Sequence, residues 1–433
     1  MAGAREAVVV GGGIGGLVAA RVLADHFERV TLLEQDEVTA DTEYHSGVPQ
    51  ARHPHALLAR GAEVLERLFP GLGAELDRLG VPSGDQAQKT RLRMVTGWAP
   101  EGVLGLTIRC FTRVCLETCL RRRVLALPRV RLRAGARVDD LCFDEAGLRV
   151  TGVRVGSEVV AADFVVVAAG RHAKLRDRLA AAGFDVPEDL VVNGGLSYST
   201  RLYHVPPGAR RDWIATAQGT HAPVVRRGGA VFAVEADRWQ ICLIGSGGEP
   251  TPTDQDGFLA YARSLDNPLI AQCVEQGVPA GELYRVVGLG NRWTPFHRMS
   301  RWPRRLAALG DVVCSFNPVY GQGMTVAALE AEELGGLLSR STDLDALGWR
   351  FQRRAARVLR LPWRMATSAD LGWTATRSGP AARLVRWYLD RMIEVLPGDL
   401  AVYRRFFQVA QMVKGPSALF DPRVVAKVLA GPR

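Results

Sequence analysis

The sequence predicts an α/β protein in which a second, mostly antiparallel sheet is inserted into a parallel-sheet domain and a helical region follows. Residues 7–34 show a buried strand, a glycine-rich turn, a helix and a second strand, which is the pattern of a βαβ unit. Between residues 190 and 247, strands with alternating apolar residues replace this pattern. From residue 324 onward the chain is mainly helical and rich in Arg, Leu and Trp.

The same patterns divide the chain into four segments. Residues 1–185 and 291–340 are expected to form the two parts of a nucleotide-binding domain. Residues 186–290 are expected to form the inserted sheet domain, and 341–433 the C-terminal helical region. The other expected elements are strands at 164–167, 196–203, 230–235, 239–244 and 306–309 and helices at 54–68, 112–127 and 324–338.

Composition excludes several classes of protein. The 433 residues are 47% apolar and 23% charged, which is typical of a globular chain and not of a disordered or fibrous one. The formal charge of +10 comes from basic residues spread along the chain, so we expect attraction of anionic cofactors and no nucleic-acid binding. The longest apolar stretch, residues 7–20, contains five glycines and is too short for a membrane span. With no signal peptide pattern, we expect a cytoplasmic location.

Metal-binding and disulfide patterns are weak. The seven cysteines include no C-x-x-C pair, so neither a zinc site nor a disulfide framework is expected. Asp41, Glu43 and His45 are metal-ligand residue types, but the pattern favours a flexible acidic loop. We therefore expect no metal. The oligomeric state stays open.

A glycine motif at residues 11–16 fits G-x-G-x-x-G between the first strand and helix. Gly11 permits the tight turn, Gly13 lets the backbone approach a pyrophosphate, and Gly16 lets helix and strand pack closely. Glu34 follows the second strand, 18 residues beyond Gly16, and is placed to accept hydrogen bonds from ribose hydroxyls. This context predicts a dinucleotide site and favours FAD or NAD over NADP.

A second motif joins the end of the strand at 306–309 to the helix at 324–338. Gly310-Asp311 ends the strand, and an Asn-Pro-Val-Tyr-Gly-Gln-Gly-Met loop covers residues 317–324. Asp311 is placed to accept hydrogen bonds from a polyol such as ribitol. The positive end of the following helix would face a negative group there.

These two motifs together resemble the class A FAD-dependent monooxygenases of the p-hydroxybenzoate hydroxylase fold. The likeness covers nearly the whole chain and is closer to a natural-product subgroup, which contains polyether polyene epoxidases and flavoproteins that catalyse a [4+2] cyclisation. Its marks lie at residues 47–55, 65–71, 316–324, 361–363 and 419–422.

The resemblance implies a set of FAD contacts. They are the pyrophosphate glycines Gly11, Gly13 and Gly16, the ribose acid Glu34, the loop arginine Arg52, the diphosphate–ribityl arginine Arg113, the adenine contact Val138, the ribityl and pyrophosphate acid Asp311, and the isoalloxazine contacts Gly321, Gln322, Gly323 and Met324. For Arg52 and Arg113 the alternative is a surface salt bridge. For His53 we expect a structural role, as a cap or hydrogen-bond partner of the helix after Pro54, and not acid–base chemistry.

One departure from the family pattern concerns the end of the strand at 164–167. The family carries an aspartate here, whereas Val167 or Ala169 stands in its place. The loss puts efficient reduction by NAD(P)H in doubt, although Arg171 and Lys174 remain able to attract a phosphate.

The leading hypothesis is an FAD-dependent monooxygenase, an epoxidase or hydroxylase that uses NAD(P)H on a large, polyketide-like substrate in secondary metabolism. The alternatives are a non-redox cyclase that keeps FAD as a structural element, and a flavoprotein reductase or dehydrogenase. The chemistry would belong to the flavin, so no catalytic side chain is named. Expected pocket walls, for each of which a plain core role is the alternative, are Tyr198, Phe232, Trp239, Phe296 and Tyr320.

Overall fold

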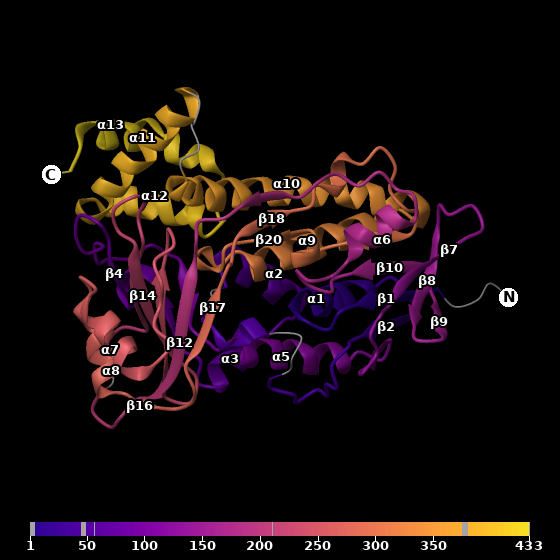
Figure 1. Ribbon diagram of the computed structural model, residues 1–433, viewed down its shortest axis with the longest axis horizontal. Helices are drawn as coiled ribbons and strands as arrows, with labels where there is room; N and C mark the ends of the chain where they lie inside the picture. The colour runs from indigo at the N-terminus through magenta and orange to yellow at the C-terminus, as the bar shows by residue number, and fades with distance from the viewer. Residues whose placement is uncertain (1–4, 45–48, 56, 210, 375–379, 433) are drawn as a thin grey trace.

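A five-stranded parallel sheet forms one half of the computed structural model, which describes residues 5–44, 49–55, 57–209, 211–374 and 380–432 (Figure 1). The strand order is β19-β10-β1-β2-β6, so the chain leaves this sheet after β10 and returns to it at β19. The strands are β1 (Glu6–Val10), β2 (Arg29–Leu33), β6 (Val130–Arg133), β10 (Phe164–Val167) and β19 (Leu306–Ala308). This confirms the fold class that the sequence predicts. His45 and the first two residues of the mark at 47–55 lie outside the described residues.

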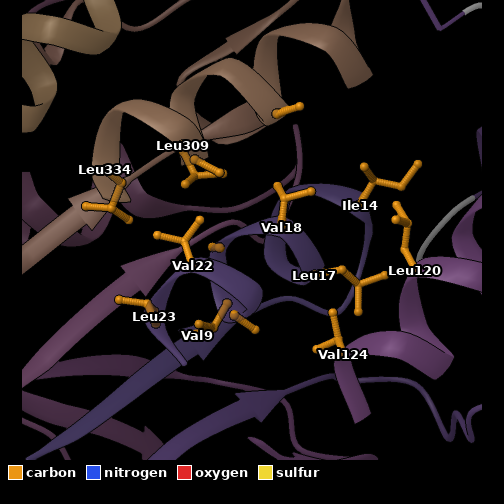
Figure 2. Close-up of a cluster of buried hydrophobic side chains, with 14 of the residues drawn as sticks. Val9, Ile14, Leu17, Val18, Val22, Leu23, Leu120, Val124, Leu309 and Leu334 are labelled. Carbon is orange, nitrogen blue, oxygen red and sulfur yellow. The ribbon is translucent and has the colours of Figure 1, made fainter. Parts of the chain in front are cut away.

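Helices cover one face of this sheet. Helix α1 (Ile14–Leu23) packs between α9 (Gly323–Leu338) and α5 (Arg113–Leu125) (Figure 2). Leu17 and Val18 on α1 are fully buried there, and Leu334 on α9 and Leu120 on α5 close the layer from its two sides. Fully burying each such side chain contributes about 1.5–3 kcal/mol. The continuous apolar runs in the sequence are therefore explained by burial of the strands on both faces.

The other face of the parallel sheet packs against a small antiparallel meander, α6 and α10. Val165 and Val167 of the sheet form one buried cluster with Leu141 and Val153 of the meander and Leu179 of α6. The elements are β7 (Asp140–Phe143), β8 (Val150–Val155), β9 (Glu158–Ala161), α6 (Leu175–Ala181) and α10 (Leu344–Asp370).

A seven-stranded, mostly antiparallel sheet forms the opposite half of the molecule. Its path is β16-β12-β15-β14-β13-β4, and β17 pairs with β12. The strands are β4 (Thr90–Arg93), β12 (Ser197–His204), β13 (Ala215–Gln218), β14 (Arg227–Val234), β15 (Arg238–Gly245), β16 (Val278–Pro279) and β17 (Tyr284–Val287). The sequence pattern places all of 1–185 in the nucleotide-binding domain, but strand β4 of this segment pairs in parallel with β13. That part of the boundary needs correction, because backbone hydrogen bonds hold β4 in the second sheet.

Alternation divides this sheet into two faces. One face packs against α7 (Gln255–Arg263) and α8 (Pro268–Gln276) through Tyr203, Trp239 and Ile241. The other face carries Tyr198, Thr200 and Gln240 and is directed toward the parallel-sheet half, since Gln240 Nε2 donates to the Arg52 carbonyl at 3.2 Å.

The remaining elements surround these two sheets. A third sheet of order β11-β18-β20 lies beside α10, and the C-terminal helices pack together at one end of the molecule (Figure 1). Among the described residues, no helix is both long and apolar enough to cross a membrane. These elements are α2 (Ala59–Leu68), α3 (Leu72–Arg78), β3 (Ser83–Asp85), α4 (Gln86–Lys89), β5 (Thr107–Arg109), β11 (Leu190–Val192), β18 (Asn291–Trp293), β20 (Cys314–Ser315), α11 (Pro380–Val395), α12 (Leu400–Ala410) and α13 (Pro422–Ala430).

Candidate cofactor and substrate site

A cavity of about 650 Å³ lies where the carboxyl ends of the parallel strands meet the second sheet. Its size is in the range of pockets that hold small molecules and cofactors. Val10, Leu33, Ala168 and Gly310 line it at or just beyond the ends of four strands, and Tyr198 lines it from β12. Ligands bind at this edge of open α/β sheets.

The glycine motif shapes the turn between β1 and α1. Gly11 has φ +104°, and a Cβ there would lie 2.6 Å from the Ala168 carbonyl oxygen. A Cβ on Gly16 would lie 1.7 Å from the Gly11 carbonyl oxygen, so this close packing requires glycine. A Cβ on Gly13 meets nothing closer than Arg113 Nη2 at 3.8 Å and would point into open space. Gly11 and Gly16 are thus needed for the fold, whereas Gly13 leaves room in the cavity.

Helix α1 presents its amino end to this cavity. Gly13 is its N-cap and has no side chain to cap the first turn, which also contains no acidic residue. Unpaired N–H groups and the helix dipole make such an end favourable for an anion.

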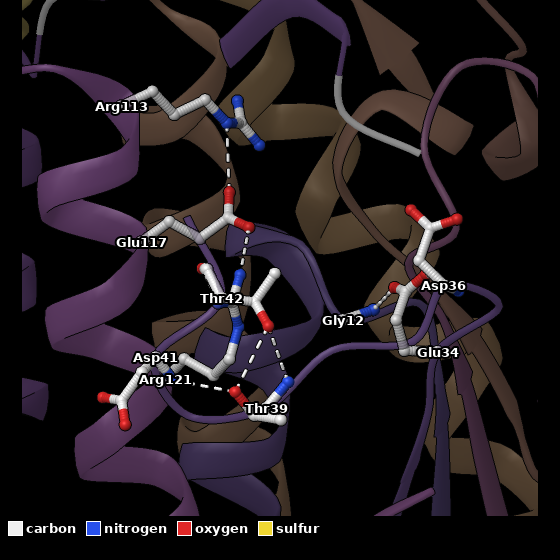
Figure 3. Close-up of polar contacts among 9 residues, drawn as sticks. All are labelled: Gly12, Glu34, Asp36, Thr39, Asp41, Thr42, Arg113, Glu117 and Arg121. Atoms are coloured by element: carbon white, nitrogen blue, oxygen red, sulfur yellow. Dashed lines mark hydrogen bonds and ion pairs between the residues drawn. The ribbon is translucent and has the colours of Figure 1, made fainter. Parts of the chain in front are cut away.

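Glu34 is held at the end of β2. Its Oε2 accepts a hydrogen bond from Gly12 N at 2.6 Å, and Oε1 accepts one from Asp36 N at 3.0 Å (Figure 3). The carboxylate is buried and lines the cavity.

Arg113 belongs to a buried network on α5. The alternative prediction of a surface salt bridge is therefore wrong for this residue, because its ion pair with Glu117 is largely buried. Its Nε donates to Glu117 Oε2 at 3.1 Å, and Arg121 Nη2 donates to Glu117 Oε1 at 2.8 Å (Figure 3). Arg121 Nη1 also donates to the Thr42 carbonyl at 2.7 Å. This chain of contacts holds the Arg113 guanidinium at the cavity wall.

His55 supports the same arginine as a neutral ring. Burial, reinforced by the Arg113 charge, lowers the pKa of His55 to about 3. Its Nδ1 lies 2.8 Å from the His53 carbonyl, which only accepts, so Nδ1 carries the proton. The unprotonated Nε2 faces Arg113 Nη1 at 3.4 Å and accepts from it.

His53 and Arg52 reach the second sheet. The expected contact of His53 with a helix after Pro54 needs correction, because that helix starts at Ala59 and His53 Nδ1 lies 2.8 Å from Thr200 Oγ1 on β12. Burial lowers the pKa of His53 to about 4, so it is neutral at pH 7. The Arg52 guanidinium stacks between Tyr44 and Tyr284, at 4.9 and 4.2 Å from their ring centres, and donates to the Tyr284 hydroxyl.

The Gly310-Asp311 turn rests on a buried carboxyl of α9. Gly310 N donates to Glu330 Oε2 at 2.7 Å, and Glu330 Oε1 has no partner among the described residues. Burial raises the pKa of Glu330 to about 8. Burial also raises the pKa of Asp311, although the nearby charges of Arg113 and Arg171 oppose that shift.

The loop at 317–324 is held from behind. Asn317 accepts from Val319 N through Oδ1 at 3.0 Å and donates to Asp370 at the end of α10. Tyr320 donates to Asp370 Oδ1 at 3.1 Å. The loop ends at α9, whose first turn has no acidic residue and no side-chain cap. A second helix amino end therefore faces the cavity, and Gly321, Gln322, Gly323 and Met324 line it.

All but one of the residues expected to bind the cofactor line this cavity; Gly16 lies behind the turn. The residues that line it are Gly11, Gly13, Glu34, Arg52, Arg113, Val138, Asp311, Gly321, Gln322, Gly323 and Met324.

Of the five expected pocket walls, Tyr198 lines the cavity and the other four do not. Trp239 packs against α7 and α8 because odd-numbered residues of β15 face those helices. Phe296 packs edge-on against Trp302 in the core, and Tyr320 turns its hydroxyl to Asp370. Phe232 is half-buried on the cavity-facing side of the sheet but lies outside the lining.

The second-sheet wall includes residues that sequence reasoning missed. Tyr284, Val286 and Leu289 line the cavity, and Val286 lies opposite Tyr198 in the β12–β17 pairing. The strand pattern at 284–287 was the available signal. Tyr198 is 4% exposed, and its hydroxyl has no hydrogen-bond partner among the described residues.

The stretch at 167–169, where the resemblance leads us to expect an aspartate, also lies at the cavity. Ala168 and Ala169 line it, and Arg171, His172 and Lys174 follow them along its edge. Within the described part of the chain, no group of three or more His, Cys, Asp or Glu side chains is placed to hold a metal ion.

Comparisons with known proteins identify relatives of this chain and structures of similar fold. The family described as an NAD(P)-binding Rossmann-like domain matches residues 9–69. Protein Rv3254 of Mycobacterium tuberculosis is 32% identical over 403 residues, which cover 88% of this chain and 83% of that protein. PqsL, a probable FAD-dependent monooxygenase from Pseudomonas aeruginosa, superposes with a TM-score of 0.63 at 18% identity, over 85% of this chain and 97% of that one.

Klebsiella pneumoniae HpxO, solved with FAD and uric acid, superposes with a TM-score of 0.60 at 18% identity, over 99% of this chain and 97% of that one. The chain therefore has the same fold as a probable FAD-dependent monooxygenase. The family match covers the Rossmann-like segment that contains the glycine turn and helix α1. Because it is 32% identical over 88% of this chain and 83% of that protein, this protein belongs to the same family as Protein Rv3254 of Mycobacterium tuberculosis.

Proposed function

We propose that the protein is an FAD-dependent monooxygenase that uses NAD(P)H and O2 to oxygenate a small molecule. The observation that carries this proposal is a single cavity that runs from the glycine motif to an apolar wall on the second sheet. Gly13 and Asp311 line the nucleotide side of that cavity, and Tyr198, Val286 and Leu289 line the other. A dinucleotide and a second ligand would therefore meet inside one enclosure.

The residues present fit FAD. The space beside Gly13 and the uncapped end of α1 suit a pyrophosphate, and Arg113 adds a fixed positive charge. Glu34 is placed to accept hydrogen bonds from the ribose hydroxyls, and Asp311 from the ribityl chain. The Val138 backbone is placed to contact the adenine. When bound, FAD supplies the redox chemistry.

The chain's own groups bind, orient and exclude water. The uncapped amino end of α9 favours negative charge at the adjacent part of the cavity. The neutral His53 ring and the free Tyr198 hydroxyl offer hydrogen bonds to a bound substrate without adding charge. In the overall reaction, one oxygen atom of O2 enters the substrate and the other leaves as water, with two electrons from NAD(P)H.

For the substrate we propose a large, mainly apolar molecule of polyketide type from secondary metabolism, which would undergo epoxidation or hydroxylation. The apolar character of Val286, Leu289, Phe316 and Pro318 supports a hydrophobic partner. The lack of an acidic residue at 167–169 favours a second candidate, a non-redox cyclase in which FAD is structural and the apolar wall folds a polyene into a reactive geometry.

The test incubates FAD-loaded protein with candidate polyenes and electron-rich aromatics, with and without NAD(P)H, in air and under argon. A product heavier by one oxygen atom, formed only with both NAD(P)H and O2, supports the monooxygenase. An isomer of unchanged mass, formed at full rate under argon without nicotinamide, contradicts it and supports the cyclase.

A further inference from the structure

Four basic side chains gather at one edge of the cavity, between the adenine-side wall and the start of α6. Arg137 follows β6, and Arg171 follows β10. Lys174 is the N-cap of α6, and Arg178 lies one turn further along that helix. Arg178 Nη2 donates to the Val138 carbonyl at 2.9 Å, which places α6 against the loop that carries Arg137. Arg171 lies close enough to Asp311 for its charge to act on that carboxyl.

None of these four cations forms an ion pair within the described residues. Two other arginines of the cavity are held in place by protein groups, Arg113 by Glu117 at 3.1 Å and Arg52 by two tyrosine rings. Arg285 lines the cavity from β17, on the second-sheet side. The acidic side chains that line the cavity are Glu34 and Asp311, and both oxygens of Glu34 already accept backbone hydrogen bonds.

The charge at this edge exceeds what bound FAD would require. Its two phosphates carry two negative charges, and they would meet the amino end of α1 and Arg113. Four unpaired cations at the neighbouring edge leave a surplus that a second anion would neutralise.

The edge is also open to a ligand. Gly170 has φ +75°, and a Cβ built there meets no atom within 4 Å. Lys174, His172 and Arg137 are exposed, so they reach a ligand that enters from solvent. An aspartate at residue 167 or 169 would place a negative charge beside them, whereas the alanine and valine present leave the field positive.

We propose that this basic edge, formed by Arg137, Arg171, Lys174 and Arg178, binds the 2′-phosphate of NADPH and makes the protein prefer NADPH to NADH. The inference rests on the proposed function, in which a nicotinamide dinucleotide approaches FAD. A phosphomonoester carries about two negative charges and three acceptor oxygens, which suits several converging Arg and Lys side chains.

The test measures binding and not turnover, so its failure differs from failure of the proposed reaction. FAD-loaded protein is titrated calorimetrically with 2′,5′-ADP, with AMP, which lacks the second phosphate, and with 3′,5′-ADP, the corresponding part of coenzyme A. We expect 2′,5′-ADP to bind about tenfold to a hundredfold more tightly than AMP, and more tightly than 3′,5′-ADP.

The double variant Arg171→Ala/Lys174→Ala should lose that advantage while its FAD absorbance stays unchanged. Arg176→Ala is the matched control, since it removes one charge from the same helix at a residue that does not line the cavity. Equal binding of 2′,5′-ADP and AMP would overturn the proposal. So would tighter binding of 3′,5′-ADP, or loss of FAD from the double variant, which would assign the cations to the flavin phosphates. Absence of flavin reduction by NADPH, with the binding preference intact, would count against the monooxygenase and not against the site.

Discussion

The two walls of the cavity are built by different rules. On the nucleotide side, backbone turns decide the geometry: Gly11 and Gly16 sit where any Cβ would collide with backbone oxygen, and two helix amino ends point at the same space. On the second-sheet side, strand register decides which side chains face the cavity. Tyr198 faces it and Trp239 does not, although both are aromatic residues of paired strands.

The comparison shows why one wall is easier to read from sequence than the other. A glycine motif is local, and each of its members has a steric reason that holds within a few residues. A residue on a strand faces one side or the other according to its parity, and a shift of one residue exchanges the faces.

The largest expected effect separates two glycines of the same turn. Gly16→Val should prevent folding, because its Cβ would lie 1.7 Å from the Gly11 carbonyl oxygen. Gly13→Val should fold but lose most of its FAD, because its side chain would fill the open space beside α1. Circular dichroism and flavin absorbance of the purified variants measure the two effects. Full flavin content in Gly13→Val would show that the pyrophosphate lies elsewhere.

Trp239→Ala tests the parity of the second sheet. Removing this fully buried side chain from its packing with α7 and α8 should lower the free energy of unfolding by about 3–5 kcal/mol. Guanidinium unfolding measures the loss, and Trp98→Ala, at a residue 42% exposed, is the control. If the Trp239→Ala protein is as stable as the wild type and has an altered substrate affinity, the packing assignment is wrong and Trp239 lines the cavity.

Asp311→Ala tests the nucleotide side again. Loss of an acceptor for a ribityl hydroxyl removes a charge-assisted hydrogen bond worth about 1.5–3 kcal/mol, so the Kd for FAD should rise about tenfold to a hundredfold. Asp311→Asn keeps an acceptor and should lose less. Titration of the apoprotein with FAD gives both constants, and an unchanged Kd would exclude Asp311 from the site.

Glu330 links stability to pH. Because its pKa is raised to about 8 in the folded state, its protonated form stabilises the fold; the contribution is complete below about pH 4.5 and is lost as the pH rises through 8. Between pH 5.5 and 7.5 we expect a loss of about 1–3 kcal/mol that Glu330→Gln abolishes. Unfolding at both pH values measures it, with Glu333→Gln, at a half-buried residue of the same helix, as control. Equal pH slopes in wild type and Glu330→Gln would contradict the assignment.

The smallest effect compares two tyrosines on opposite faces of β12. Tyr198→Phe removes a hydroxyl that has no hydrogen-bond partner in the described part of the chain. It should raise KM about twofold to tenfold, the value of one neutral hydrogen bond, without loss of FAD. Tyr203→Phe removes a hydroxyl that contacts Gln255 on the helix-covered face and should leave KM unchanged. Steady-state kinetics on an identified substrate separates the two, and equal KM values would remove Tyr198 from substrate binding.

The sequence by itself determined the fold class, the elements of the parallel sheet and the position of its glycine turn. These features depend on local periodicity and on steric limits that act within a few residues. Helix α2 starts five residues later than predicted, because the chain at 52–55 serves the cavity and the second sheet instead.

Only the tertiary structure decided which side chains share the cavity. His53 meets Thr200 across 147 residues of sequence, Gly310 N meets Glu330, and Lys174 joins Arg137 at an open edge. No periodicity encodes such pairs, because they depend on how the two sheets and α6 are placed against one another. The burial that lowers the pKa of His53 and His55 and raises that of Glu330 arises from the same packing.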